Sequence, residues 1–317
     1  MIQAVLTNSQ HPEYGVVTVP FPIPREEYDH VIELLAPLEI GDSVAQDCHI
    51  KEVSGDFPAL RQLEQTNANL DEFDYLAKRL DSFDNYEKAQ FQGMASKLGL
   101  HGVDELINLT FCCQETTIIT DFSNLEKVGR RHFLTLGGGI SIEKMQGEDF
   151  REIARCLIES EVGYITPYGV TYSNGMELSQ IYDGKHFPEY IYEDCMMELE
   201  LIPDTGPEDT ANIAFLYLPM EQTQIERTML RIGVDNYGDI RFRVMESRLP
   251  EEINAALSME HEGIAELNQM CETIAKLGPE DQAKLGAVVT LAQPEYASQV
   301  KNLAENLGLF DFIPSIQ

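Results

Sequence analysis

Several groups of residues in the sequence are of types that could support chemistry, and their spacing decides which chemistry is possible. The run Leu136-Gly137-Gly138-Gly139-Ile140 resembles a phosphate-binding loop only in its glycines, because neither a following Lys-Ser/Thr nor a G-x-G-x-x-G spacing is present. Asp235-Asn236-Tyr237-Gly238-Asp239 lacks the spaced ligands and the closing glutamate of a calcium loop. We therefore predict a flexible connection at the first run and a turn between a helix and a strand at the second.

The seven histidines and six cysteines do not have the spacing of metal ligands. No two histidines form H-x-x-x-H or H-E-x-x-H, and no C-x-x-C pair is present. Cys48 and His49 are neighbours that would point to opposite faces of a strand. We expect reduced, mostly buried thiols and no metal site.

Catalytic patterns are equally weak. Ser141 and Ser173 lack the flanking glycines of a nucleophile elbow. Adjacent carboxylates such as Glu26-Glu27 and Asp71-Glu72 are frequent in so acidic a chain, so they say almost nothing about acid-base catalysis. We predict no catalytic, cofactor-binding or metal-binding residues, and a protein that is not an enzyme.

Charge is the main functional signal of the sequence. The 317 residues include 54 acidic and 22 basic side chains, a net charge of −32 that would repel nucleic acid. With 13 Tyr, 14 Phe and 43% hydrophobic residues, the chain can bury real cores, unlike a disordered acidic protein. Duplex DNA carries about one charge per 1.7 Å, so the excess charge equals that of roughly 54 Å of duplex. A merely solvated acidic surface is the alternative interpretation.

The acidic residues are segregated along the chain. Lys and Arg are absent between Arg25 and Lys51, and again between Lys185 and Arg227. Such segregation predicts continuous negative faces rather than a surface of salt bridges. We predict that the surface that binds a partner contains Glu26, Glu27, Asp29, Glu33, Asp71, Glu72, Asp74, Asp81, Asp84, Glu193, Asp194, Glu198, Glu200, Asp204, Glu208 and Asp209.

An internal repeat indicates which elements position these residues. Apolar positions in residues 73–109 recur in residues 267–303 at an offset of 194, with the three- and four-residue spacing of amphipathic helices. Two helices are predicted in each copy. Upstream, at an offset of 197, a strand leads through a proline into an acidic helix in both copies.

Each copy therefore reads strand, helix, strand, helix, helix. The predicted strands are residues 16–21 and 49–53 in the first copy and 214–218 and 240–244 in the second. We predict an α+β fold in an elongated multi-domain chain with an N-terminal module (residues 1–110), a mixed central segment (111–195) and a C-terminal module (196–317).

The central segment has its own pattern. We predict a strand at residues 116–120, a helix at 149–159 and a hairpin at 170–178 with Asn174-Gly175 as its turn. The chain shows no export signal and no apolar stretch long enough to span a membrane, which favours a cytoplasmic location.

Residues 70–80, 91–94 and 105–110 together resemble the ArdA antirestriction proteins of mobile elements. The resemblance covers the N-terminal module and extends through residues 107–121 and 167–192. It implies an acidic homodimer without a cofactor, which imitates bent B-form DNA and occupies the DNA-binding groove of a type I restriction-modification complex, formed by its specificity and methyltransferase subunits. The acidic residues would then stand in for phosphates, and the protein itself would not bind nucleic acid.

Two other functional hypotheses remain open. The chain could be an acidic inhibitor of another DNA-binding defence system, such as a phage-exclusion or CRISPR effector. It could also be an enzyme that uses the aromatic-rich region around Tyr164, Tyr168, Tyr172 and Asp183, although aromatic density more often indicates a core.

Overall fold

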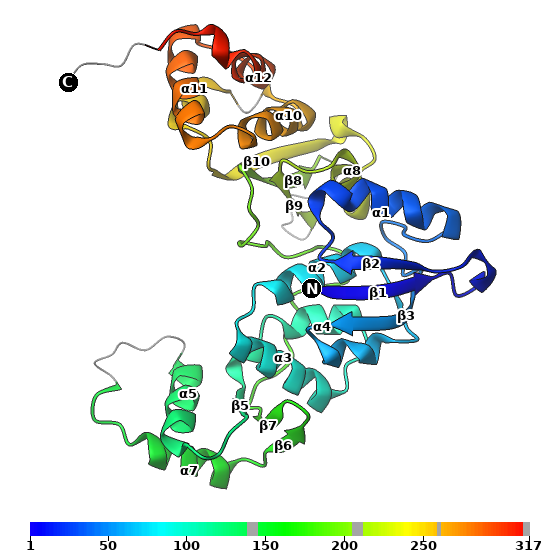
Figure 1. Ribbon diagram of the computed structural model, residues 1–317, viewed down its shortest axis with the longest axis vertical. Helices are drawn as coiled ribbons and strands as arrows, with labels where there is room; N and C mark the ends of the chain where they lie inside the picture. Colours follow the sequence, from blue (N-terminus) through cyan, green and yellow to red (C-terminus); the bar gives the residue numbers. More distant parts are fainter. Residues whose placement is uncertain (138–144, 205–211, 259–260, 313–317) are drawn as a thin grey trace. The chain divides into compact units, whose positions relative to one another are not determined.

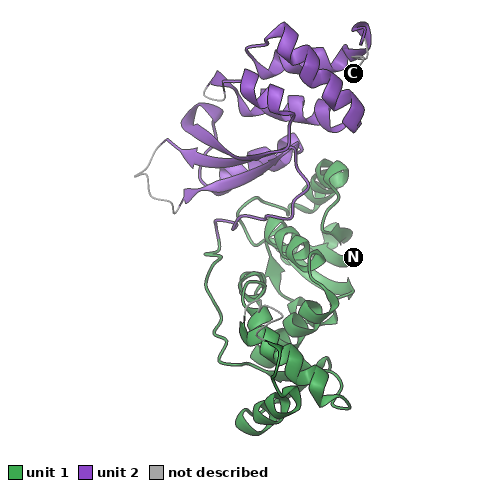
Figure 2. Ribbon diagram, turned by 90° about the vertical axis from the view of Figure 1, so that its left-hand side faces the viewer, with its two compact units in different colours: residues 1–184 green, residues 185–317 purple. Residues whose placement is uncertain are grey.

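The computed structural model describes residues 1–137, 145–204, 212–258 and 261–312, and has an α+β fold of helices and antiparallel sheets (Figure 1). The chain divides into two compact units, residues 1–184 and 185–317 (Figure 2). Unit 1 therefore contains the N-terminal module together with most of the predicted central segment. The boundary at residue 184 precedes the predicted start of the C-terminal module at residue 196.

The first sheet of unit 1 is built on a strand that the predicted module lacks. Its strands are β1 (Ile2–Thr7), β2 (Val17–Phe21), β3 (Cys48–Gly55) and β4 (Asn67–Ala68). They are antiparallel in the order β2-β1-β3-β4. On β1 the apolar Ile2, Ala4 and Leu6 are buried while Gln3 between them is exposed, so one face of the sheet belongs to the core.

Helix α1 (Tyr28–Leu35) follows β2, and three further helices follow the sheet: α2 (Leu70–Asp81), α3 (Asn85–Leu98) and α4 (Val103–Leu109). The side chains of Asn69 and Asp84 accept backbone N–H groups at the starts of α2 and α3. Gly99, with a φ of 65°, ends α3. Our prediction of two helices here was wrong, because the left-handed Gly99 divides the second one.

A second sheet and two helices complete unit 1. The strands are β5 (Thr117–Ile119), β6 (Tyr164–Thr166) and β7 (Gly169–Tyr172), in the order β5-β7-β6, and the helices are α5 (Leu125–Gly137) and α7 (Phe150–Ser160). The predicted strand at 116–120 and helix at 149–159 are confirmed. Helices α5 and α7 cross closely at Gly129, where an added Cβ would lie 1.7 Å from the carbonyl oxygen of Phe150. Gly138 and Gly139 of the glycine run lie outside the described residues.

The predicted hairpin at residues 170–178 was wrong. Strand β7 pairs with β6, which precedes it, and with β5. Asn174 and Gly175 do adopt positive φ values of 53° and 80°, as an Asn-Gly turn requires. The chain beyond the turn is held by the buried side chain of Asn108, which accepts the N–H groups of residues 181 and 182 at 2.7 Å, instead of returning as a strand.

Unit 2 has one three-stranded antiparallel sheet and five helices among its described residues. The strands, in the order β10-β8-β9, are β8 (Met197–Pro203), β9 (Ala214–Leu218) and β10 (Ile240–Ser247). The helices are α8 (Gln222–Arg231), α9 (Glu251–Ala256), α10 (Ile264–Ala275), α11 (Pro279–Ala292) and α12 (Ala297–Glu305). Met197, Leu199 and Leu201 of β8 are fully buried in the core with residues of the helices. As in unit 1, the central strand was missing from the predicted module.

The elements of the two units match at the offsets of the sequence repeat. Helices α2 and α10 both have 12 residues and start at positions 70 and 264. Helices α3 and α11 both have 14 residues and start at positions 85 and 279. In the β2-β1-β3-β4 sheet of unit 1 and the β10-β8-β9 sheet of unit 2, the first strand of the unit lies between two others. The repeated apolar spacing therefore corresponds to a repeated architecture.

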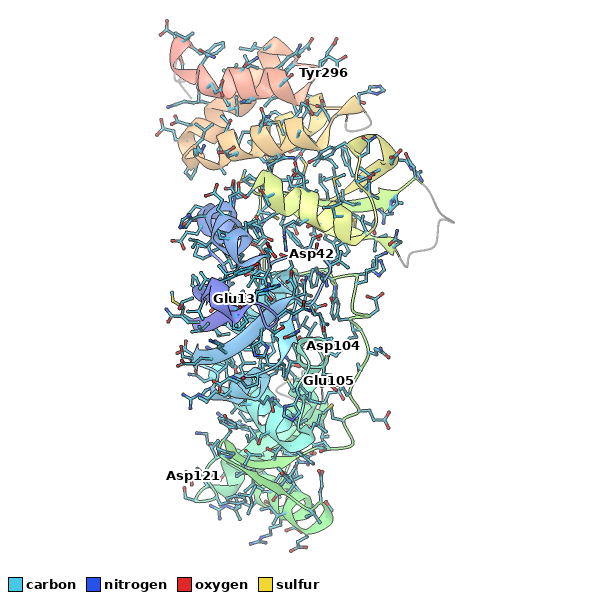
Figure 3. The ribbon with its side chains drawn as sticks, turned by 90° about the vertical axis from the view of Figure 1, so that its right-hand side faces the viewer. Glu13, Asp42, Asp104, Glu105, Asp121 and Tyr296 are labelled. Carbon is cyan, nitrogen blue, oxygen red and sulfur yellow. The ribbon has the colours of Figure 1, made fainter. Side chains whose placement is uncertain are left out.

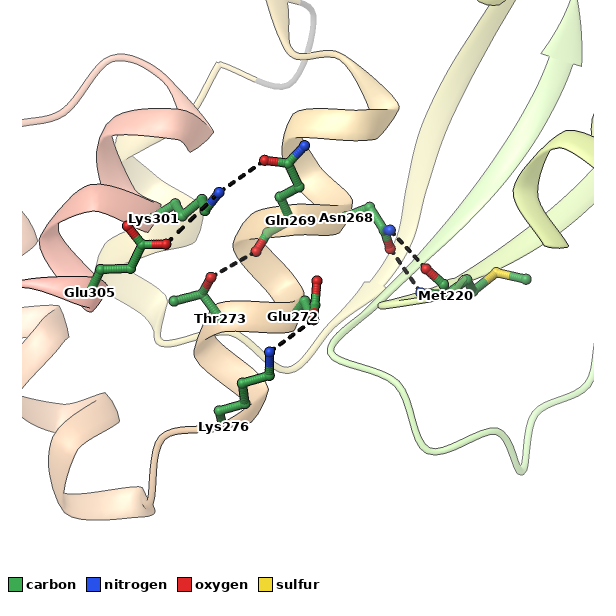
Figure 4. Close-up of polar contacts among 8 residues, drawn as sticks. All are labelled: Met220, Asn268, Gln269, Glu272, Thr273, Lys276, Lys301 and Glu305. Carbon is green, nitrogen blue, oxygen red and sulfur yellow. Dashed lines mark hydrogen bonds and ion pairs between the residues drawn. The ribbon is translucent and has the colours of Figure 1, made fainter. Parts of the chain in front are cut away.

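The match extends to a polar contact between helix and strand. In unit 1, Asp74 Oδ1 accepts the backbone N–H of Ile23 at 2.6 Å. At the matching positions of unit 2, Asn268 Oδ1 accepts the N–H of Met220 at 2.8 Å, and the Asn268 amide donates to the Met220 carbonyl oxygen (Figure 4). Both side chains satisfy a backbone group after the edge strand, one that is buried in unit 1 and partly buried in unit 2, which is an architectural role.

Candidate functional site

Both units are acidic. Residues 1–184 carry 30 acidic and 13 basic side chains, and residues 185–317 carry 24 and 9. In Figure 3, carboxylates lie on both sides of unit 1: Glu13 and Asp121 point to one side, and Asp104 and Glu105 lie on the other. The question for function is which of these charges are left uncompensated.

The first cluster lies on α1 and on the turns before and after it, and on the helix amphipathic spacing separates the carboxylates from the core. Tyr28, Val31 and Leu35 are buried. Glu26, Glu27, Glu33 and Glu39 are exposed, while Asp29 is half-buried. The only ion-pair partner of these five side chains among the described residues is His30, 4.0 Å from Glu33. This cluster, which we call the α1 cluster, presents charges that no lysine or arginine of the described chain neutralises.

A second group lies near α2 and α3. Asp81 and Asp84 are exposed at the turn between these helices. Asp84 caps α3 by accepting the N–H groups of Tyr86 and Glu87 at 2.7 and 2.8 Å. Asp71 is half-buried and accepts the hydroxyl of Tyr28. Of these three carboxylates, Asp81 is the one that is exposed and makes no bond to another described side chain or backbone group through its carboxylate.

Four of the predicted surface residues are buried, so their assignment to an exposed surface was wrong. In unit 1, Glu72 is 2% exposed and accepts the hydroxyl of Tyr182 at 2.8 Å. Asp74 is 6% exposed, binds the Ile23 N–H and lies 3.7 Å from Lys78. Sequence alone could not separate them from exposed neighbours, because both lie on the face of α2 that the rest of the unit covers.

The other two buried carboxylates lie on β8 in unit 2. Glu200 forms an ion pair with Arg243 of β10 at 2.5 Å. Glu198 lies opposite Tyr217 and Glu246 on the adjacent strands, and its Oε1 has no hydrogen-bond partner among the described residues. Burial, and then the nearby carboxylates of Glu189 and Glu246, raise the pKa of Glu198 to about 7.

The remaining predicted residues of unit 2 are largely compensated or lie beyond the described chain. Asp194 is exposed and pairs with Arg248 at 3.0 Å, and Asp204 pairs with Arg241. Glu193 is half-buried. Glu208 and Asp209 lie outside the described residues.

The cations of the two units contact both aromatic rings and carboxylates. In unit 1, several cationic groups lie over aromatic rings: Arg79 over Phe111 at 4.1 Å, Lys88 over Phe57 at 5.5 Å, Arg130 over Phe150 at 5.6 Å and Arg131 over Tyr86 at 4.4 Å. In unit 2, ion pairs join Arg241, Arg243, Arg248, Lys276, Lys284 and Lys301 to carboxylates. Unit 2 also has cations over aromatic rings, Arg231 over Phe187 and Lys284 over Phe312, and unit 1 also has ion pairs, so both kinds of contact occur in both units.

Sequence reasoning omitted several exposed carboxylates of unit 1 from the predicted surface. Among the described residues, Glu39, Glu52, Glu115, Glu159 and Glu177 are exposed and bind no other side chain. Glu39 lies in the cation-free stretch, which could have identified it. Local hydrogen bonds keep other carboxylates ionised: backbone N–H groups and His11 lower the pKa of Glu13, and Ser123 lowers the pKa of Asp121.

The candidate metal ligands, the aromatic-rich region and the cysteines can each be placed in the structure. No group of three or more His, Cys, Asp and Glu side chains among them is placed to hold a metal ion. Tyr172, from the aromatic-rich region, is 4% exposed and packs in the core of the second sheet with Ile119. Cys48, Cys112, Cys113 and Cys271 are buried free thiols. None of the helices in the described segments could cross a bilayer.

Comparison of the chain with known protein families, with characterised proteins and with solved structures gave no match.

Proposed function

We propose that this protein is a DNA mimic that inhibits a DNA-binding defence enzyme by occupying its DNA-binding groove, and that the enzyme is a type I restriction-modification complex. The observation that supports this most directly is the α1 cluster, a set of carboxylates on and beside a folded helix, four of them exposed, that no lysine or arginine of the described chain neutralises.

A rigid support distinguishes such a cluster from an acidic tail. Tyr28, Val31 and Leu35 fix α1 to the core, so its carboxylates are held in place before a partner binds. The protein then loses less conformational entropy on binding than a flexible acidic tail would. A cationic groove would bind an array of charges that is already ordered.

The choice of a type I complex as target rests on the resemblance of residues 70–80, 91–94 and 105–110 to ArdA proteins. In the proposed complex the specificity and methyltransferase subunits bind the acidic faces in place of duplex DNA, and no bond is made or broken. The protein acts in the cytoplasm, where its target lies.

The experiment is displacement of labelled duplex DNA from a type I methyltransferase complex by the purified protein, over a series of salt concentrations. We expect displacement that weakens as salt rises, because exposed charges are screened within about 10 Å at 0.1 M salt. If the protein displaces no DNA at any of the salt concentrations, the proposed target is refuted. A second panel with other DNA-binding defence enzymes would then separate a wrong target from a wrong mechanism.

Charge-neutral variants locate the binding surface. The triple variant Glu26→Gln, Glu27→Gln and Glu33→Gln removes three uncompensated charges. We expect it to weaken displacement by about 3-fold to 150-fold, since each exposed pair contributes ~0.2–1 kcal/mol and three contribute ~0.6–3 kcal/mol. The matched control, Glu272→Gln, Glu280→Gln and Glu305→Gln, removes three charges of unit 2 that already pair with lysines. If both variants displace DNA equally poorly, only the total charge matters and not its position.

A further inference from the structure

Unit 1 contains a small cavity that the acidic surfaces do not explain. It is lined by residues of strand β5, of the turn that follows this strand and of the first two turns of helix α5. The buried side chains of Ile118, Ile119 and Val128 form its apolar part. Its volume of about 50 Å³ gives room for about four water molecules, or for one group of similar size.

Two cations line this cavity, and no carboxylate of the described chain pairs with either of them. Lys127 and Arg131 lie one turn apart on α5, and so on one side of the helix. Neither forms an ion pair with a described residue. Glu126, the neighbour of Lys127, pairs instead with Arg151 at 3.9 Å. In a chain with 54 acidic and 22 basic side chains, two adjacent cations without such a partner are unexpected.

Stacking holds the Arg131 side chain in place. Its guanidinium lies over the ring of Tyr86, 4.4 Å from the ring centroid. The Tyr86 hydroxyl in turn accepts the backbone N–H of Ile118 at 3.3 Å, so the ring is fixed to a strand that lines the cavity. A guanidinium that stacks through its face keeps the N–H groups at its edge for another partner.

Neutral donors lie beside the two cations. The Asn124 amide and the Thr120 hydroxyl also line the cavity, and neither donates to a described residue. Asp121 is the one carboxylate among the lining residues. Its two oxygens accept the N–H and the hydroxyl of Ser123, each at 2.8 Å. The cavity therefore has several donors whose acceptors the described part of the chain does not supply.

We infer that this cavity binds a phosphate group, with Arg131 and Lys127 as charged ligands and Asn124 and Thr120 as neutral donors. A guanidinium donates to two phosphate oxygens at once, and an ammonium attracts the phosphate as a point charge. A phosphate group offers at least three acceptor oxygens to these four side chains, whereas a carboxylate offers only two. A sugar or base attached to the phosphate would lie outside a cavity of this size.

The test is isothermal titration calorimetry of the full chain with inorganic phosphate, at constant ionic strength and at pH 8, where a phosphate group is mostly a dianion. We expect the wild type to bind and Arg131→Gln to weaken binding by about tenfold or more, since hydrogen bonds to a charged group are lost. Lys127→Gln should also weaken binding. The exposed Lys127 side chain makes no hydrogen bond or ion pair with a described residue, so this variant keeps the fold.

The matched control is Arg130→Gln. Arg130 lies on the same helix, is also exposed and also stacks on a ring, that of Phe150 at 5.6 Å, but it does not line the cavity. The control therefore removes the same charge one residue away from the site. Circular dichroism checks that all three variants are folded.

Binding that Arg131→Gln and Lys127→Gln weaken and Arg130→Gln leaves intact is the expected result. A second titration, with adenosine monophosphate, identifies the source of the phosphate: tighter binding than that of inorganic phosphate indicates a larger ligand that extends beyond the cavity, and equal or weaker binding indicates free phosphate.

A wild-type chain that binds neither compound would overturn the inference. So would an equal loss of binding in Arg130→Gln and Arg131→Gln, because the overall charge and not the cavity would then decide binding. The inference is independent of the proposed function, since no methyltransferase complex takes part in the titration and the α1 cluster is not part of this cavity.

Discussion

Replacing Glu198 by glutamine should make the protein more stable at alkaline pH. Glu198 is 5% exposed on the central strand of unit 2, its Oε1 has no hydrogen-bond partner among the described residues, and burial followed by Glu189 and Glu246 raises its pKa to about 7. A glutamine of the same shape keeps the packing and cannot ionise. The variant thus isolates the effect of one buried negative charge.

The magnitude follows from the difference between the unfolded pKa of 4.5 and the folded pKa of about 7. Below pH 4.5 the carboxyl is protonated in both states, so its raised pKa carries no penalty there. Between pH 4.5 and 7 the unfolded chain ionises while the folded chain keeps its proton, and the free energy of unfolding falls with rising pH. Above pH 7 the penalty is complete at ~3 kcal/mol, because each tenfold change in the acid dissociation constant corresponds to ~1.4 kcal/mol.

The assay is urea denaturation of wild type and Glu198→Gln at pH 5 and pH 8, followed by a signal from unit 2. We expect a small difference at pH 5 and a gain in stability for the variant, up to ~3 kcal/mol, at pH 8. Glu200→Gln is the matched control on the same strand, and it should destabilise the fold because it breaks the ion pair with Arg243. If the effect of Glu198→Gln is the same at both pH values, the buried-charge explanation is refuted.

Two further predictions concern unit 1. Asp74→Asn should leave the free energy of unfolding nearly unchanged, because its amide oxygen can still accept the N–H of Ile23. Asp74→Ala should lower it by ~1–3 kcal/mol, and an equal loss of stability for both variants in urea denaturation would contradict an architectural role. Gly129→Ala should lower the thermal unfolding midpoint of unit 1, since the added Cβ would lie 1.7 Å from the Phe150 carbonyl oxygen, and an unchanged midpoint would show that α5 and α7 can separate without loss.

The helices of this protein could be predicted from sequence because their apolar spacing is regular and occurs twice. The offset of 194 between residues 73–109 and 267–303 agrees with the matching lengths of α2 and α10 and of α3 and α11. The break at Gly99 was missed because hydrophobic periodicity does not register a left-handed residue. The central strands β1 and β8 were missed because short alternating runs at the start of a module carry a weak signal.

The acidic surface was predicted less well than the helices. A count of carboxylates along the chain cannot tell an exposed glutamate such as Glu26 from Glu72, which meets a tyrosine hydroxyl 110 positions away. Nor does it show that the arginines of β10 neutralise Glu200 and Asp204 on and just after the neighbouring strand. Such pairings depend on strand register, which only the folded chain reveals.

The central claim is that this protein and duplex DNA compete for one surface of a type I methyltransferase complex. The most direct measurement is the dissociation constant of the protein for that complex at a fixed low salt concentration, in the presence of increasing unlabelled duplex. We predict that the apparent dissociation constant rises in proportion to the DNA concentration, as binding to one shared site requires. Binding whose affinity does not change with DNA would contradict mimicry.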